Sequence, residues 1–306
     1  GEVTGTASKK LGLPAGTPVI TAGGDQQCAA LGLGIIRSHL IEANTGTGSF
    51  VLAHTEKSVR DDKKRVICSA AAKAGDYILE AGIFTTGAVY RWFRDNFGEI
   101  EKEAAEKLEI DPYQILDAEA EKSSVGGEGL MLIPHLAASA APYWNPRALG
   151  VLVGMTLGHT REDVVRAFLE GIVLEINKNI QIMEELVGEA EEIRVSGGAA
   201  SSSFFNQIQA DIYGKSVIRT DFEESSALGA AVLAAAEMNI YSDLNQAVKH
   251  MVSFDKSSRC QPDTDNHKIY RKMGQVHHQI YRALEKEGVF EKISQIKAMK
   301  QEVNRE

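Results

Sequence analysis

Three glycine-rich turns, each placed directly after a short apolar run, constrain the fold of this chain more than any other feature of its sequence. The turns are Gly23-Gly24-Asp25, Gly46-Thr47-Gly48 and Gly197-Gly198-Ala199. Apolar runs before or around them, such as 19–22, 40–43 and 193–196, are typical of buried strands. Glycine permits positive φ and close approach, so such turns can present backbone N–H groups to an anion. Taken alone, each turn is better explained as an ordinary tight turn.

The rest of the chain alternates between the strand and helix periods. Hairpins are predicted at 40–53 and 66–81, and further strands at 130–133, 151–155 and 216–219. Helical spacing predicts helices at 86–97, 101–108, 112–121, 160–186, 202–213 and 226–238. Thr160 with Asp163 three residues later is typical of a capping-box start for the longest of them. Together these segments predict an alternating α/β fold.

The composition, together with motifs that the sequence does not match, excludes several classes of protein. The 306 residues can bury a full core without disulfides, and a formal charge of −9 argues against nucleic-acid or membrane-surface binding. No apolar run approaches the roughly 20 residues of a membrane span. The three scattered cysteines favour a reducing, cytoplasmic location and form no zinc motif. A P-loop before Lys215 fails because its first glycine would be Gln209.

Individual polar residues leave two interpretations open. Asp25 follows an apolar run through two glycines, so it either projects a carboxylate from a sheet edge into a ligand site or starts the next helix as a cap. His135 is either catalytic or, more commonly for an isolated histidine, structural. His277-His278 is interpreted as a solvated face, and Trp92 as core.

Nine motifs, in order, resemble the C-terminal half of the FGGY carbohydrate kinases, and the resemblance covers residues 12–283. They are GLPAGTPV (12–19), GDQQ (24–27), TGTGS (45–49), 82–92, PYWNPRALG (142–150), GVLVGM (150–155), VSGGAASS (195–202), QADIYG (209–214) and 223–231. The chain also opens Gly-Glu-Val-Thr with no methionine and no signal-peptide features, which suggests either a piece of a longer polypeptide or one product of a split gene.

The resemblance implies a ribonuclease-H-like α/β domain of the actin-like ATPase superfamily, in which helices flank a mixed sheet. Residues 1–285 would form the C-terminal, nucleotide-binding domain, and 286–306 a charged helical tail. Nothing in the sequence matches the Asp-x-Gly-x-Thr hairpin of the family's first domain. That missing N-terminal domain would be the partner that supplies most Mg²⁺ and sugar ligands, so the isolated chain is expected to be inactive. A second copy of the chain, forming a homodimer, is left open as a further partner.

The resemblance also assigns roles to individual residues. Asp25 would accept the proton of the sugar or polyol hydroxyl, and Gln26 would position that substrate. ATP would be held by Gly46, Thr47, Gly48, Gly87, Arg91, Gly197, Gly198, Ala199 and Ser202. No metal ligand is assigned within the chain.

Two questions of function stay open at this point. The Gly-Asp-Gln-Gln motif is similar to glycerol kinases, whereas the spacing over 142–150 is more similar to xylulose kinases. An actin-like nucleotide-binding module without phosphoryl transfer is the alternative from another class. Retention of both 24–27 and the Pro-x-Trp-x-Pro loop favours carbohydrate kinase chemistry.

Overall fold

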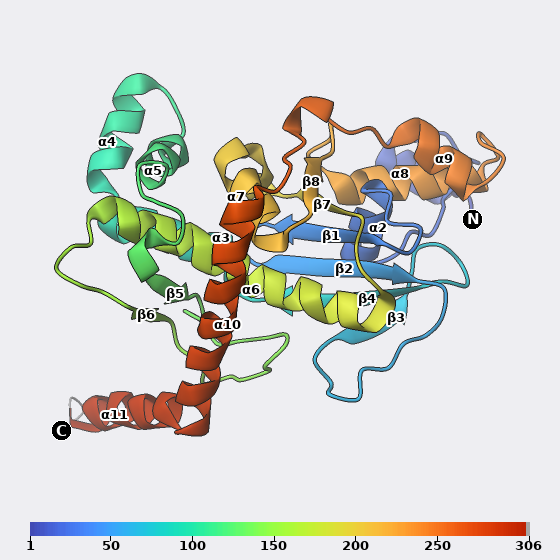
Figure 1. Cartoon of the computed structure of the whole chain (residues 1–306). Coiled ribbons are helices and arrows are strands. Elements are labelled where there is room, and N and C mark those ends of the chain that lie inside the picture. The colour runs from blue at the N-terminus through green and yellow to red at the C-terminus, as the bar shows by residue number, and fades with distance from the viewer. Residues whose placement is uncertain (304–306) are drawn as a thin grey trace.

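A computed structural model describes residues 1–303 and contains one six-stranded sheet and one two-stranded sheet (Figure 1). The large sheet has the order β3-β4-β2-β1-β7-β8. Its strands are β1 (Leu40–Thr45), β2 (Ser49–Thr55), β3 (Ile67–Ala70), β4 (Tyr77–Ile83), β7 (Glu192–Ser196) and β8 (Ser216–Arg219). The small sheet pairs β5 (Met131–Ile133) with β6 (Val151–Val153).

Eleven α-helices surround these strands in the described part of the chain. They are α1 (Gly5–Leu11), α2 (Asp25–Gly32), α3 (Gly87–Phe97), α4 (Glu99–Leu108), α5 (Pro112–Ala120), α6 (Arg161–Val187), α7 (Ser203–Tyr213), α8 (Ser225–Glu237), α9 (Leu244–Met251), α10 (Thr264–Lys286) and α11 (Val289–Val303). Short 3-10 turns lie at η1 (Gly127–Gly129), η2 (Gly198–Ser201) and η3 (Lys256–Ser258). No described helix combines the length and apolar composition that crossing a bilayer requires.

The large sheet is mixed, as the resemblance implies. Strands β1, β2, β4 and β3 pair antiparallel in this order, with β3 at the edge, and β7 and β8 continue the sheet parallel to β1. In the register between β1 and β7, Asn44 lies opposite Ser196. Because both strands end here, the turns that follow them, 46–48 and 197–199, lie side by side at one edge of the sheet.

Helices cover both faces of this sheet, and the alternation of side chains decides which helix meets which residue. The face that carries Ile41, Val51 and Leu79 packs on α6, whose Thr160–Asp163 capping box forms as predicted. The opposite face, with Leu40 and Leu52, packs on α2. In Figure 1, α10 crosses in front of α6, and α11 leads away from the body.

Three sequence predictions are wrong. Residues 19–22 form no strand: Val19 is 53% exposed, and among the described residues its backbone bonds reach only Gly1, next to an isolated bridge between Glu2 and Pro18. An apolar run indicates that a segment tends to be buried, but it does not reveal whether a sheet is present for that segment to join. His277 is buried and its Nε2 lies 2.9 Å from the Leu132 carbonyl, whereas Trp92 is 42% exposed on α3. Of the expected tail, 286–306, most lies in α11, and 304–306 are outside the described residues.

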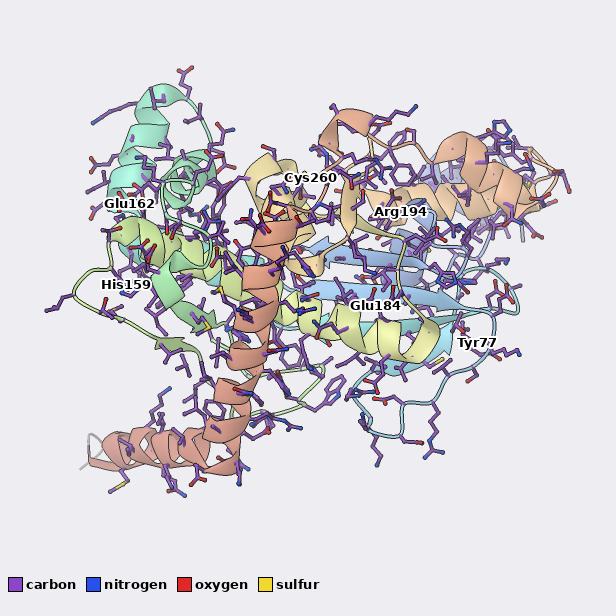
Figure 2. All side chains as sticks on the ribbon, viewed as in Figure 1. Tyr77, His159, Glu162, Glu184, Arg194 and Cys260 are labelled. Carbon is purple, nitrogen blue, oxygen red and sulfur yellow. The ribbon has the colours of Figure 1, made fainter. Side chains whose placement is uncertain are left out.

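Helix α2 is held against its neighbours by close backbone contact and by one arginine. A Cβ atom at Gly229 of α8 would overlap the Cys28 carbonyl of α2, and one at Gly32 would overlap the Ser225 carbonyl. From β7, the Arg194 guanidinium donates to the carbonyls of Leu33 and Gly34, which follow α2 (Figure 2). Glycine at 229 therefore sets the distance between α2 and α8.

We expect Gly229→Ala to destabilise the protein by about 2 kcal/mol, because the added methyl group must push α8 away from α2. The better helix propensity of alanine offsets only part of this loss. Gly5→Ala is the matched control, since Gly5 is also helical and its Cβ would meet no atom within 4 Å. Urea denaturation followed by circular dichroism measures both. Equal midpoints for the two variants would contradict the tight crossing.

Candidate functional site

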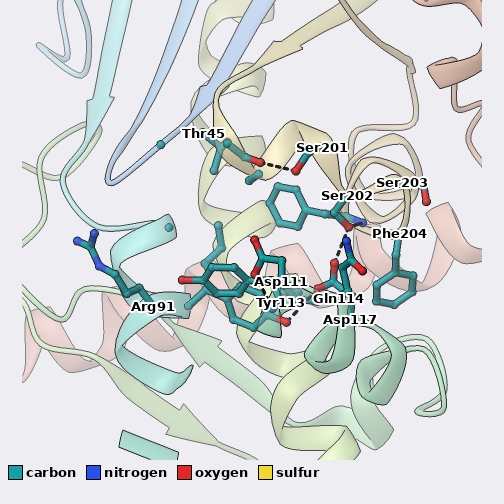
Figure 3. A pocket seen from close by; sticks show the side chains of 18 of the residues that line it. Thr45, Arg91, Asp111, Tyr113, Gln114, Asp117, Ser201, Ser202, Ser203 and Phe204 are labelled. Carbon is teal, nitrogen blue, oxygen red and sulfur yellow. Dashed lines mark hydrogen bonds between the residues drawn. The ribbon is translucent and has the colours of Figure 1, made fainter. Parts of the chain in front are cut away.

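A cavity of about 670 Å³ lies beside the adjoining ends of β1 and β7. Its floor comes from Leu169 and Ile172 of α6. The two glycine turns and η2 form one side, and α5 forms the other, so segments far apart in sequence meet here (Figure 3). Seven of the predicted site residues line it: Gly46, Thr47, Gly87, Arg91, Gly198, Ala199 and Ser202.

Several of the predicted glycines are required by backbone packing rather than by space for a ligand. A Cβ at Gly197, where φ is +85°, would lie 2.5 Å from the Thr45 carbonyl oxygen. A Cβ at Gly48 would lie 2.5 Å from the Ile83 carbonyl oxygen, and one at Gly87 would overlap the Gly46 carbonyl. These contacts bring the turn after β7, the hairpin after β1 and the start of α3 together. Neither Gly48 nor Gly197 lines the cavity.

Gly198 is different, because a Cβ there would meet no protein atom within 4 Å. The residue is exposed, lines the cavity and has no positive φ that would demand glycine. The protein alone therefore gives no reason for the missing side chain. A ligand lying against the bare backbone of Gly198 and Ala199 would supply that reason.

The hairpin between β1 and β2 has some of its N–H groups already bonded. The Gly46 N–H donates to the Gly48 carbonyl at 2.9 Å, and the Gly87 N–H donates to the Gly46 carbonyl at 3.1 Å. Within the described residues, no turn bond engages the N–H groups of Thr47 and Gly48. Of the three amides expected to hold phosphate, these two are therefore the ones available to an anion.

Helix α5 contributes a wall that the sequence analysis missed. Asp117 accepts a hydrogen bond from the Tyr90 hydroxyl at 2.9 Å and one from the Ser202 hydroxyl at 2.6 Å (Figure 3). Burial raises the pKa of Asp117, although the two hydroxyl donors act to lower it. The sequence indicated only a charged, exposed helix at 112–121, and no local motif marks residue 117 as part of a site.

Aromatic rings and an arginine complete the wall. The rings of Tyr90 and Tyr113 stack at 5.1 Å, and the Arg94 guanidinium lies 5.0 Å from the Tyr113 ring centre. Arg91, one turn before Arg94 on α3, lies at the opposite end of the cavity from Asp117 (Figure 3). The cavity therefore has a basic end near the hairpin and an acidic end at α5.

The structure places Asp25 and Gln26 outside this cavity. Asp25 is exposed in the first turn of α2, where its Oδ1 accepts from the Gln26 N–H at 2.9 Å and its carbonyl accepts from the Ser226 hydroxyl. Helix α2 lies on the sheet face opposite α6. Asp25 is therefore the first residue of α2, but the N-cap is Gly24 and no described side chain caps the helix, so Asp25 is not its cap. Its catalytic role stays a prediction.

Neighbouring polar residues hold this first turn on the sheet. The Gln27 amide donates to the Ser69 hydroxyl at 3.2 Å and to the Glu80 carboxylate at 3.4 Å. Burial raises the pKa of Glu80, and the nearby charge of Asp25 adds to the effect. Farther in, both oxygens of the fully buried Glu42 lack a hydrogen-bond partner among the described residues, and burial raises the pKa of its carboxyl group.

His135 lies in a second polar group, within the core and away from the cavity. It is 2% exposed, and its Nε2 lies 3.8 Å from the Glu175 carboxyl of α6, which is 1% exposed. Desolvation lowers the pKa of His135 to about 3 and raises the pKa of Glu175 to about 8. Both groups are therefore neutral at pH 7, and the structural interpretation of His135 fits this setting better than catalysis.

This pair predicts a stability change with pH. Because the folded-state pKa of Glu175 is raised, its stabilising contribution is complete below pH 4.5 and is lost as the pH rises to about 8. The lowered pKa of His135 instead makes the folded state more stable as the pH rises, but this contribution to stability is already complete above pH 6.5. Between pH 6.5 and 8 we expect the wild type to lose stability relative to Glu175→Gln, by about 1.4 kcal/mol per pH unit. Urea unfolding of both proteins at each pH measures the difference; parallel profiles would contradict it.

No group of three or more His, Cys, Asp or Glu side chains is arranged to bind a metal ion within residues 1–303. A metal at this site would therefore be bound with the help of the ligand or of residues outside the described chain. The features that do converge at the cavity are the free amide of Thr47, with that of Gly48 next to it in the hairpin, the exposed backbone of Gly198, and two ends of opposite charge. Such a set suits an elongated ligand that carries an anion at one end.

Comparison with solved structures defines the class of fold. The ligand-bound xylulose kinase from Lactobacillus acidophilus superimposes with a TM-score of 0.83, at 24% identity, over 92% of this chain and 54% of that one. The Plasmodium falciparum glycerol kinase crystallised with ADP gives 0.74 at 27% identity, over 88% of this chain and 52% of that one. The chain therefore has the ribonuclease-H-like fold of the actin-like ATPases, as predicted.

Sequence comparison gives the family. The model of the C-terminal domain of the FGGY family of carbohydrate kinases matches residues 42–238, and the chain belongs to this family. A glycerol kinase from Thermococcus gammatolerans is 38% identical over 247 residues, 80% of this chain and 48% of that protein. A gluconokinase from Bacillus licheniformis is 32% identical over 278 residues, 90% of this chain and 53% of that protein. The chain thus spans about half the length of these relatives.

Proposed function

We propose that this chain is the nucleotide-binding half of an ATP-dependent carbohydrate kinase that phosphorylates a hydroxyl group of a sugar or polyol. The observation that carries the proposal is the cavity beside the adjoining turns 46–48 and 197–199 in a member of the FGGY family. Gly198 and Ala199 would face the adenosine, and Thr47 and Gly48 would donate their free N–H groups to phosphate oxygens. The nucleotide would supply the phosphoryl group.

In this proposal the chain supplies two contributions to catalysis. Donors fixed in the hairpin stabilise charge on the transferring phosphate without having to reorganise. The Asp25 carboxylate accepts the proton of the attacking hydroxyl, and its exposed position on α2 leaves room for a substrate beside Gln26. Magnesium would accompany the phosphates, with its protein ligands mainly outside this chain. The three free thiols are consistent with the cytoplasmic location that we propose for this activity.

The acceptor is proposed from the family rather than from the cavity. We propose a xylulose-like sugar, on the motif spacing over 142–150, with a glycerol-type polyol as the alternative. The identity of 38% to a glycerol kinase favours testing the polyol first. A non-catalytic actin-like module is the remaining candidate, and retention of Asp25 and Gln26 argues against it.

A coupled assay of ADP formation tests the proposal. The full-length protein that carries this chain is assayed with ATP and Mg²⁺ against glycerol, gluconate, xylulose and ribulose, with the isolated chain in parallel. We expect ADP formation by the full-length protein that depends on one of these acceptors, and none by the chain alone. Acceptor-independent hydrolysis by the full-length protein would instead support the actin-like module.

A further inference from the structure

The acidic end of the cavity fixes the direction in which a nucleotide can lie. Asp117 and Glu121 line the cavity on one side of α5, whereas Arg91 lies near the hairpin at the other end (Figure 3). Phosphate groups would be repelled by the carboxylates of α5 and attracted to the free amides of the hairpin. The base therefore lies at the α5 end, between this helix and Ser202.

Ser202 cannot supply a hydrogen-bond donor to that base. Its hydroxyl oxygen accepts the Phe205 N–H at 3.0 Å as the cap of α7, and its only proton goes to Asp117 at 2.6 Å. The group behind it, Asp117, is held by two hydroxyl donors, one on each carboxylate oxygen. Each oxygen keeps a further lone pair, and an ionised carboxylate only accepts hydrogen bonds.

We propose that Asp117 is the residue that selects the base of the nucleotide, by accepting a hydrogen bond from the exocyclic amino group of adenine. This role deepens the proposed function and rests on it. A base that carries a carbonyl oxygen at the same position, such as hypoxanthine, would place that oxygen against the carboxylate. The pocket would reject it, because two acceptors then face each other with no proton between them.

Isothermal titration calorimetry of the chain with ADP and with inosine diphosphate tests this role. The two ligands differ at the 6-position of the purine, where the amino group of adenine is replaced by a carbonyl group. We expect the wild type to bind ADP at least about 10-fold more tightly, the discrimination that one hydrogen bond to a charged group provides. In Asp117→Asn the ratio should fall toward one, since the asparagine amide can donate to the carbonyl oxygen.

The outcomes of these titrations, with 2′-deoxy-ADP as a third ligand, distinguish the ways in which the proposal can fail. Equal affinity of the wild type for both ligands would overturn the role of Asp117 and leave the proposed function standing. Binding of neither ligand would overturn the nucleotide site in this chain and the proposal with it. A loss of affinity for 2′-deoxy-ADP without a loss for inosine diphosphate would assign the carboxylate to the ribose instead. The wild-type comparison does not depend on whether the variant folds.

Discussion

Replacing Asp25 by asparagine is expected to abolish sugar or polyol phosphorylation by the full-length protein, while ADP binds with unchanged affinity. Asparagine has nearly the same shape but cannot accept the proton of the attacking hydroxyl. General-base catalysis contributes about 10²- to 10⁴-fold, so kcat should fall by that factor. Nucleotide affinity should not change, because Asp25 lies outside the cavity, on the opposite face of the sheet.

Steady-state kinetics with the best acceptor, together with calorimetric titration of ADP, measures the two halves of this prediction. Asp62→Asn is the matched control, since Asp62 is an exposed acid in the loop before β3. If Asp25→Asn keeps more than about a tenth of the wild-type kcat, Asp25 is not the base. A parallel loss of ADP affinity would mean that the substitution disturbs the fold around α2.

Replacing Gly198 by leucine is expected to remove the stabilisation that adenine nucleotides give this chain. A ligand at 100 times its dissociation constant raises the free energy of unfolding by about 2.7 kcal/mol. The leucine side chain would extend into the space beside Gly198 that the protein leaves open. The unliganded fold should tolerate it, because its Cβ meets no protein atom within 4 Å.

Thermal unfolding with and without millimolar ADP or ATP gives the comparison. We expect an upward shift for the wild type, nearly equal for the two nucleotides, and no shift for Gly198→Leu. Gly158→Leu serves as the control, because Gly158 lies in an exposed turn outside the cavity. An unchanged shift in Gly198→Leu would place the nucleotide elsewhere.

Much of the fold could be predicted because its strands and helices carry strong local signals. The hairpin that contains Gly46–Gly48 has a short apolar run on each side, and the long helix after Thr160 has a capping box and one broad apolar face. The segment 19–22 shows the limit of such signals. Its composition is that of a buried strand, but burial depends on a neighbour that the local sequence does not reveal.

The candidate site, like the fold, could be predicted only in part from the sequence. The glycine turns were visible because glycine marks positions where the backbone turns tightly or approaches other atoms. The structure then separated two reasons for these glycines: Gly48, Gly87 and Gly197 pack against carbonyl groups, whereas Gly198 borders open space. Asp117 could not be found, since its partners Tyr90 and Ser202 are 27 and 85 residues away in sequence.

Amide hydrogen exchange of this chain with and without ADP tests the central claim most directly, namely that the adjoining turns after β1 and β7 hold the nucleotide. The measurement follows individual segments, so it reports where the ligand lies as well as whether it binds. The account predicts slower exchange at 45–48, 87–91 and 197–203, with little change in α9 or α10. Protection elsewhere in the chain, with these three segments unchanged at saturating ADP, would contradict it.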